Sequence, residues 1–127
     1  DGELEEGQVW EAAMCAAHYK LNNLTAFVDF NGLQIDGNIE DVMNPSPIDK
    51  KFEAFGWNAL VIDGHNYDDI IDAIEKARNC KDMPTVIVCK TIKGKGVSFM
   101  ENDAGWHGVA PSKEQCEKAL AEIGGNR

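Results

Sequence analysis

Three short and almost entirely apolar stretches constrain the fold of this chain more than any other feature. They run over residues 24–30 (LTAFVDF), 58–63 (NALVID) and 84–90 (PTVIVCK). Runs of this length and β-branched content are typical of strands that are buried on both faces, as in a parallel sheet covered by helices. Helical patterns alternate with them. The sequence therefore predicts an α/β fold with a doubly wound, mostly parallel sheet and helices on both faces.

The predicted helices lie over residues 5–21, after Ser46-Pro47 up to Gly56, over residues 67–79, and after Ser112. Ser46 and Ser112 are the predicted caps of the second and fourth helices, and Pro47 suits a first helical turn. In the third helix, acidic residues come early and basic residues late, as the helix dipole favours. Its predicted apolar stripe consists of Ile70, Ile71, Ile74 and Ala77. The first helix is apolar around most of its circumference, so we expect other protein to cover it on several sides.

Composition excludes two classes of partner. The 127 residues carry 22 acidic and 12 basic side chains, a formal net charge of −10. Such a chain repels nucleic-acid phosphate, so nucleic-acid binding is not expected. No apolar run approaches the roughly 20 residues that cross a bilayer, so no membrane partner is expected either. The length suits one domain or part of a larger one.

The cysteines indicate a reducing compartment. Cys15, Cys80, Cys89 and Cys116 lie far apart, with no CxxC pair. This spacing favours four separate reduced thiols in or near a core over a zinc site or a disulfide framework. We therefore predict a cytoplasmic protein.

The beginning of the sequence indicates a fragment. The chain opens on Asp1-Gly2-Glu3 directly before a helical stretch, with no initiator Met and no leading strand. An Asp-Gly turn that leads into a helix normally follows a strand. We therefore expect a sheet that is incomplete at its amino terminus, in a chain cut inside a motif.

The two polar positions Asp1 and Asn31 are candidate metal ligands. Ligands of doubly wound sheets bind at the carboxyl ends of the strands, and Asn31 follows the strand that ends at Phe30. If Asp1 follows a neighbouring strand, its carboxylate and the Asn31 amide oxygen converge, as hard oxygen ligands that suit Mg²⁺ or Ca²⁺. Gly2 allows close approach of a phosphate to the helix start. The alternative is an Asp helix cap and an unrelated Asn-Gly turn.

Three motifs, in order, favour the metal-diphosphate alternative. They are DGELEEGQVWEAAMCAAHYKLNNLTAFVDFNGLQIDG, FEAFGWNALVIDGHNYDDIIDAI and KTIKGKGVSFMENDAGWHGVAPS. The first resembles the thiamine-diphosphate motif of transketolases, and the three together resemble the amino-terminal subunit of split, two-chain transketolases. The resemblance covers essentially the whole chain. It implies that residues 1–127 are the carboxyl-terminal portion of a diphosphate-binding domain.

The resemblance also assigns binding roles. It implies that the side chains of Asp1 and Asn31 and the backbone carbonyl of Leu33 bind Mg²⁺, and that Gly2 and Asn31 contact the diphosphate of the cofactor, thiamine diphosphate. Phe30 stands where many members have a second Asp or Asn. Because this departure lies outside the ligand set, it leaves the expected metal site intact.

Two residues carry implied catalytic roles. His107, in Gly-Trp-His-Gly, matches the family histidine beside the diphosphate and the reacting carbon, where an imidazole suits proton transfer. Glu6 matches a glutamate at the subunit interface; a solvated first-turn acid is its alternative. Lys93 or Lys95 either approaches the cofactor or belongs to a surface loop. His18 and His65 fall on no family motif, and we interpret both as structural.

The resemblance implies an enzyme that transfers a two-carbon ketol unit from a ketose phosphate to an aldose phosphate. It further implies a partner subunit or domain that binds the cofactor's pyrimidine ring, and an oligomer. Because that partner supplies the activating glutamate, we expect this chain alone to be catalytically silent. The alternatives are a non-catalytic α/β binding or assembly module, and a related enzyme such as deoxyxylulose-phosphate synthase.

Overall fold

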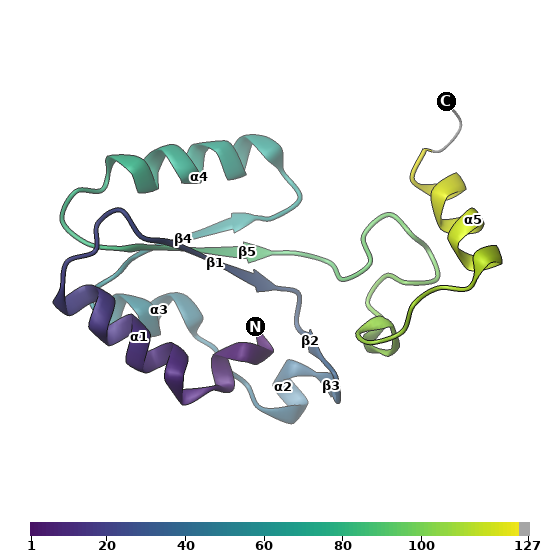
Figure 1. Cartoon of the computed structure of the whole chain (residues 1–127), viewed down its shortest axis with the longest axis horizontal. Coiled ribbons are helices and arrows are strands. Elements are labelled where there is room, and N and C mark those ends of the chain that lie inside the picture. Colours follow the sequence, from purple (N-terminus) through teal and green to yellow (C-terminus); the bar gives the residue numbers. More distant parts are fainter. Residues whose placement is uncertain (125–127) are drawn as a thin grey trace.

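The computed structural model describes residues 1–124 and is built on a three-stranded parallel sheet (Figure 1). Strand β5 (Thr85–Lys90) lies in the middle, between β1 (Thr25–Phe30) and β4 (Asn58–Asp63). Both pairings are parallel, and Thr25 and Asn58 are each in register with Thr85. The predicted parallel α/β sheet is therefore confirmed. Because the three strands point the same way, their carboxyl ends meet at one edge.

Helices cover both faces of the sheet, as predicted. Helices α1 (Gly7–His18) and α3 (Ile48–Ala54) lie on one face and α4 (Tyr67–Asn79) lies on the other (Figure 1). A short 3₁₀ helix, η1 (Gly2–Glu5), leads into α1. The Asn66 side chain caps α4 by accepting hydrogen bonds from the Asp68 and Asp69 amides, which explains why this helix begins where the sequence indicates.

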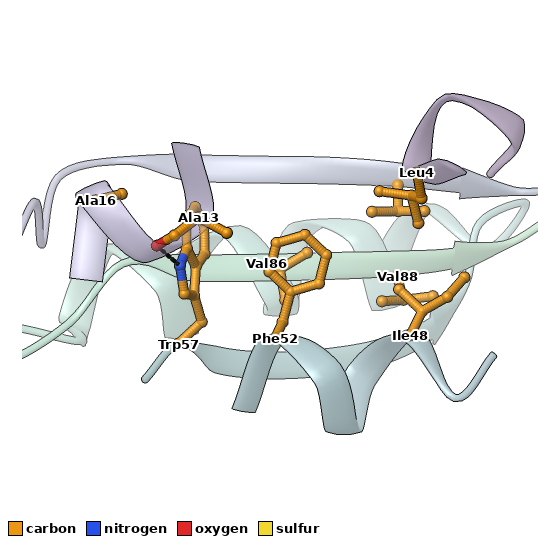
Figure 2. Close-up of a cluster of buried hydrophobic side chains, with 9 residues drawn as sticks. Leu4, Ala13, Ala16, Ile48, Phe52, Trp57, Val86 and Val88 are labelled. Carbon is orange, nitrogen blue, oxygen red and sulfur yellow. Dashed lines mark hydrogen bonds between the residues drawn. The ribbon is translucent and has the colours of Figure 1, made fainter. Parts of the chain in front are cut away.

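The larger core joins α1 and α3 to the sheet (Figure 2). Phe52 and Trp57 pack edge to face with ring centroids 5.3 Å apart. The buried Trp57 Nε1 donates a hydrogen bond of 2.8 Å to the Ala13 carbonyl in α1. The buried members of this core are Leu4, Ala13, Ala16, Val28, Ile48, Phe52, Trp57, Val86 and Val88. The core thereby fixes α1, and with it the chain start, against the sheet.

The smaller core lies under α4 and corrects the predicted stripe of this helix. Ala73 and Ala77 are buried against Ile87, whereas Ile71 is 57% exposed. A sheet of three strands has a narrow face, so only the residues in the middle of the apolar stripe of α4 pack against the sheet. The small residue Ala73, which the sequence analysis did not include, is one of the two residues of this helix that are buried.

Strand β1 is not buried on both faces, contrary to the prediction. Val28 packs under α1 and is buried, but Phe27 on the opposite face is 54% exposed. Helix α4 packs over β4 and β5 and does not extend over β1 in the described residues. The central strand β5, by contrast, is buried from Thr85 to Val88, as predicted.

Helix α1 is shorter than residues 5–21, and much of its apolar surface is exposed. It ends at His18, and Lys20 adopts a left-handed backbone conformation with φ of 52°. Only Ala13 and Ala16 are buried, and Met14 is 54% exposed. The sheet covers one stripe of this helix, and Trp10 packs beside it against Phe52 and Phe55 of the α3 segment. The side of the helix that carries Met14 and Cys15 is exposed within residues 1–124.

All four cysteines are free thiols, as predicted, but two are not near a core. Cys15 and Cys116 are exposed, whereas Cys80 and Cys89 are half-buried. The difference arises because Cys15 lies on the uncovered side of α1 and Cys116 lies on a helix away from the sheet.

The segment after β1 contains regular structure that the sequence analysis did not include. Strands β2 (Leu33–Gln34) and β3 (Gly37–Asn38) form a small antiparallel pair, followed by helix α2 (Ile39–Val42). Ile39, 1% exposed, anchors this segment. The predicted cap Ser46 lies outside the next helix, because its amide binds the Asn44 side chain and Pro47 takes the capping position.

The carboxyl-terminal third is a long loop and a helix that lies away from the sheet (Figure 1). The loop includes the 3₁₀ helix η2 (Ala104–Trp106) and leads into α5 (Lys113–Glu122). Ser112 and Gln115 form a capping box, which confirms the predicted cap. No helix within residues 1–124 is long and apolar enough to cross a bilayer.

Candidate functional site

An open cleft of about 830 Å³ lies beside the carboxyl end of β1. The chain start, the loop after β1 and the loop after β5 all contribute to it. Its lining residues are Asp1, Gly2, Glu3, Glu6, Gln8, Asp29, Asn31, Leu33, Gln34, Ile35, Asp36, Lys93 and His107. Every residue to which the sequence analysis gave a ligand or catalytic role is among them. Their chemical roles remain predictions.

Asp1 joins the chain start to the loop after β1. Its nitrogen donates a hydrogen bond of 2.8 Å to the Asp29 carbonyl, so Asp1 lies next to the end of β1. Its carboxylate accepts from the Gly2 amide at 3.0 Å through Oδ1 and from the Gly32 amide at 2.7 Å through Oδ2. Each oxygen keeps a further lone pair for another ligand.

Asn31 is half-buried, and two partners fix its side chain. Its Oδ1 accepts a hydrogen bond of 2.9 Å from the Leu33 amide, and its Nδ2 donates one of 3.4 Å to Asp29 Oδ2. The amide oxygen therefore lies on the side of Leu33 and retains one lone pair. The structure thus brings Asp1, Asn31 and Leu33 to one wall of the cleft, as expected if they share a ligand.

Gly2 lies where a larger residue does not fit easily. A Cβ atom at this position would be 3.0 Å from Gln34 Oε1 and 3.2 Å from Gln34 Cβ. The backbone of η1 can therefore approach the short β2–β3 pair closely. This close approach keeps Gly2 in the lining of the cleft.

The remaining candidate side chains are at the rim. Glu6 is exposed and immediately precedes α1, and His107 is exposed directly after η2. Of the two candidate lysines, Lys93 lines the cleft and Lys95 lines a separate hollow together with His65. His65 Nε2 accepts a hydrogen bond of 2.7 Å from the Ile92 amide, a contact that agrees with a structural role.

The charges of the cleft determine which ligands it can hold. Five carboxylates (Asp1, Glu3, Glu6, Asp29 and Asp36) line it, against one lysine and one histidine. Within residues 1–124, however, no three His, Cys, Asp or Glu side chains cluster closely enough to hold a metal by themselves. The oxygen donors present therefore suit a hard cation that shares its ligands with a phosphate, since Mg²⁺ commonly binds through one or two side chains and substrate phosphates.

One contact of a cleft residue, Asp29, was not predicted. The Thr91 hydroxyl donates a hydrogen bond to Asp29 Oδ1, and burial together with the Asp29 charge raises the pKa of the neighbouring Cys89 thiol. Thr91 directly follows β5, so its place at a strand carboxyl end was the available signal. Which strand lies beside β1 was not evident from the sequence.

Comparison with known proteins defines the class. The family described as "Transketolase, thiamine diphosphate binding domain" matches residues 1–126. The chain therefore belongs to the transketolase family, and its match lies in the thiamine diphosphate binding domain, as the sequence motifs indicated.

Individual relatives agree with this assignment. Over 123 residues the chain is 44% identical to a 6-deoxy-6-sulfo-D-fructose transketolase subunit of Clostridium sp. (strain MSTE9), covering 97% of this chain and 45% of that protein. It is 39% identical to human transketolase over 130 residues, covering 97% of this chain and 19% of that protein. The chain spans less than half the length of these relatives.

The fold comparison supports the same family. The crystal structure of transketolase from Campylobacter jejuni superposes with a TM-score of 0.88 at 33% sequence identity. The match covers 98% of this chain and 19% of the Campylobacter chain. The predicted fold class is therefore confirmed both by topology and by a solved relative.

Proposed function

We propose that this chain supplies the metal-diphosphate half of the thiamine diphosphate site in a transketolase-type enzyme. The enzyme transfers a two-carbon ketol unit from a ketose phosphate to an aldose phosphate. The observation that carries the proposal is the single cleft that joins Asp1, Gly2, Asn31 and Leu33 in a domain of this family. Residues 1–127 then form the carboxyl-terminal portion of the diphosphate-binding domain.

In this proposal, Asp1 and Asn31 bind Mg²⁺ or Ca²⁺ through their side chains and Leu33 binds it through its carbonyl. The acidic lining supports a bound cation, because five carboxylates would otherwise repel a diphosphate. Gly2 and Asn31 contact the diphosphate, and Lys93 adds a positive charge at the same cleft.

The rim residues complete the proposed site. His107 holds or delivers a proton at its imidazole beside the diphosphate and the substrate. Glu6, exposed at the start of α1, faces the subunit interface. Thiamine diphosphate, when bound, supplies the electron sink that carbanion chemistry requires, while the chain holds and orients it.

We also propose the partners that this arrangement requires. Two similar proteins are named as transketolase subunits, from Clostridium sp. and from Phocaeicola vulgatus. By analogy, this chain functions with a pyrimidine-binding subunit or domain, in an oligomer, on sugar phosphates in the cytoplasm. Membership of the transketolase family favours this function over a non-catalytic assembly module.

Isothermal titration of the complete enzyme with thiamine diphosphate and Mg²⁺ tests the proposal. We expect Asp1→Ala and Asn31→Ala each to weaken cofactor binding at least about tenfold, because each removes an oxygen ligand. Asn38→Ala is the matched control: Asn38 lies on β3 and binds the Asp41 side chain instead of lining the cleft. We expect unchanged binding for this variant.

Unchanged cofactor binding in both Asp1→Ala and Asn31→Ala would contradict the metal assignment. Loss of binding in the Asn38→Ala control to the same extent would also contradict it, because the effect would then reflect general disruption of the segment after β1.

A further inference from the structure

We infer that Asp29 is a positioning residue for the proposed metal site: its carboxylate fixes the orientation of the Asn31 amide and also accepts a hydrogen bond from the Thr91 hydroxyl. This inference rests on the proposed function, because it concerns the side chain that presents an oxygen to the metal. It assigns Asp29 no direct contact with metal or cofactor.

Asp29 is held where two strand ends and the chain start meet. It is the next-to-last residue of β1, and its carbonyl accepts the hydrogen bond of 2.8 Å from the Asp1 nitrogen. Its carboxylate accepts from Thr91 Oγ1 through Oδ1 and from Asn31 Nδ2 at 3.4 Å through Oδ2. One side chain thus contacts residues from both loops that line the cleft.

The contact with Asn31 decides which end of the amide reaches the cleft. A carboxylate can only accept hydrogen bonds, so it pairs with the amide nitrogen and repels the amide oxygen. On the other side, the Leu33 N–H can only donate, and it pairs with Asn31 Oδ1 at 2.9 Å. A flipped amide would place acceptor against acceptor and donor against donor. Asp29 and the Leu33 N–H therefore fix the oxygen on the side where the metal is proposed to bind.

Through its contact with Thr91, Asp29 also positions the start of the loop after β5. The Thr91 amide donates a hydrogen bond of 3.3 Å to the Phe30 carbonyl, so Thr91 continues the β1–β5 pairing beyond the strands. Two residues further on, Lys93 lines the cleft. By holding the Thr91 hydroxyl, Asp29 fixes the start of the segment that delivers this lysine.

A titration of the complete enzyme with Mn²⁺ in the presence of thiamine diphosphate tests the role of Asp29, with free Mn²⁺ followed by electron paramagnetic resonance. We expect Asp29→Ala to raise the apparent Mn²⁺ dissociation constant about 10- to 100-fold, the usual effect of removing a residue that orients a metal ligand. Asp29→Asn keeps an acceptor for Asn31 and a donor for Thr91, and we expect a change of at most about threefold.

Two further variants separate orientation from charge. Glu5 lies in η1 close to Asp1 but does not line the cleft, so Glu5→Ala is the matched control that removes an equal charge; we expect a change of at most about threefold. Thr91→Val removes one of the two partners of the Asp29 carboxylate and should weaken Mn²⁺ binding less than Asp29→Ala. In the Asp29→Ala background, Thr91→Val should add no further loss, because its effect passes through Asp29.

The inference is overturned if Asp29→Ala binds Mn²⁺ as the unmodified enzyme does, or if Glu5→Ala or Asp29→Asn weakens binding as strongly as Asp29→Ala does. If Asp29→Ala does not fold, as judged by thermal unfolding without metal, the Mn²⁺ titration of Thr91→Val tests the inference instead: unchanged Mn²⁺ binding in that variant overturns it.

Asp1→Ala and Asn31→Ala, titrated in parallel, identify which proposal fails. If both retain Mn²⁺ affinity, the proposed site and this inference fall together; if both lose it and Asp29→Ala does not, only the inference falls.

Discussion

Gly94 shows how a single residue controls the loop that brings Lys93 to the cleft. Its φ of 71° is in the left-handed region, and a Cβ atom there would lie 2.5 Å from the Met100 carbonyl oxygen. A Gly94→Ala side chain therefore costs at least about 1 kcal/mol in backbone strain, and the contact with backbone adds to it. We expect the turn to open, displace Lys93 and weaken thiamine diphosphate binding several-fold, as measured by calorimetry.

Gly108 provides the matched control for this prediction. It directly follows His107, has no left-handed φ, and a Cβ at this position meets no atom within 4 Å in the described residues. Gly108→Ala should leave cofactor affinity close to that of the unmodified protein. Equal losses in the two variants would show that the loop responds to any added side chain and not to the turn at Gly94.

At the scale of elements, α5 depends on its own loop for its position. Its residues are exposed or half-buried, and its main contacts are hydrogen bonds from the Ser98 amide and hydroxyl to the Glu122 carboxylate. Lys118 Nζ lies 4.8 Å from the centre of the Phe99 ring. In contrast to α1 and α3, this helix has no apolar core within residues 1–124 to hold it.

The attachment of α5 should be sensitive to acid. The Ser98 backbone and hydroxyl hydrogen bonds lower the pKa of Glu122. A carboxylate with a lowered folded-state pKa stabilises the folded state above its ordinary pKa, and this contribution is lost as pH falls through the lowered value. We expect the hydrogen-exchange protection of the Ser98 amide to be constant near neutral pH and to fall below about pH 4.5.

Two variants check this assignment. Glu122→Gln should reduce Ser98 protection already at neutral pH and remove its dependence on acid. Glu117→Gln, a change of the same type on the same helix, should preserve both. An acid-dependent loss that persists in Glu122→Gln would assign the transition to another group.

At the scale of the whole molecule, the cleft is open, and in the proposed function it forms one wall of a two-sided site. The apolar residues Phe27 of β1 and Met14 of α1, each 54% exposed, lie on surfaces that are uncovered within residues 1–124. We expect the 127-residue chain alone to give no measurable ketol transfer, because half of a two-sided site cannot stabilise the reaction. Ketol transfer, measured by a coupled assay, should require the remainder of the enzyme and its pyrimidine-binding partner.

The control for this experiment is the complete assembly carrying Asp1→Ala, which should lose activity although every subunit is present. Ketol transfer by the purified 127-residue chain alone, at a rate above the assay background, would contradict the expectation of a divided site.

The sequence predicted those elements whose determinants are local. Apolar runs, capping residues and charges placed as the helix dipole favours were enough to locate the strand at residues 58–63, the helix at residues 67–79 and the Ser112 cap. The β2–β3 pair and α2 were missed, because segments of two to four residues have too few positions for a period to show. The stripe of α4 was misassigned at Ile71 because its boundary depends on the width of the sheet beneath it.

By itself, the sequence determined the parallel α/β class, the order of the three long strands and the helices that alternate with them, and the candidate ligand and catalytic residues, because strand periodicity and motif spacing depend on residues that are neighbours along the chain. Only the tertiary structure decided that β5 lies between β1 and β4, that Thr91 therefore reaches Asp29, and that Lys93 rather than Lys95 lines the cleft. The physical reason is that strand order and loop direction arise from packing between segments some 60 residues apart, and the sequence of either segment alone does not specify its neighbour.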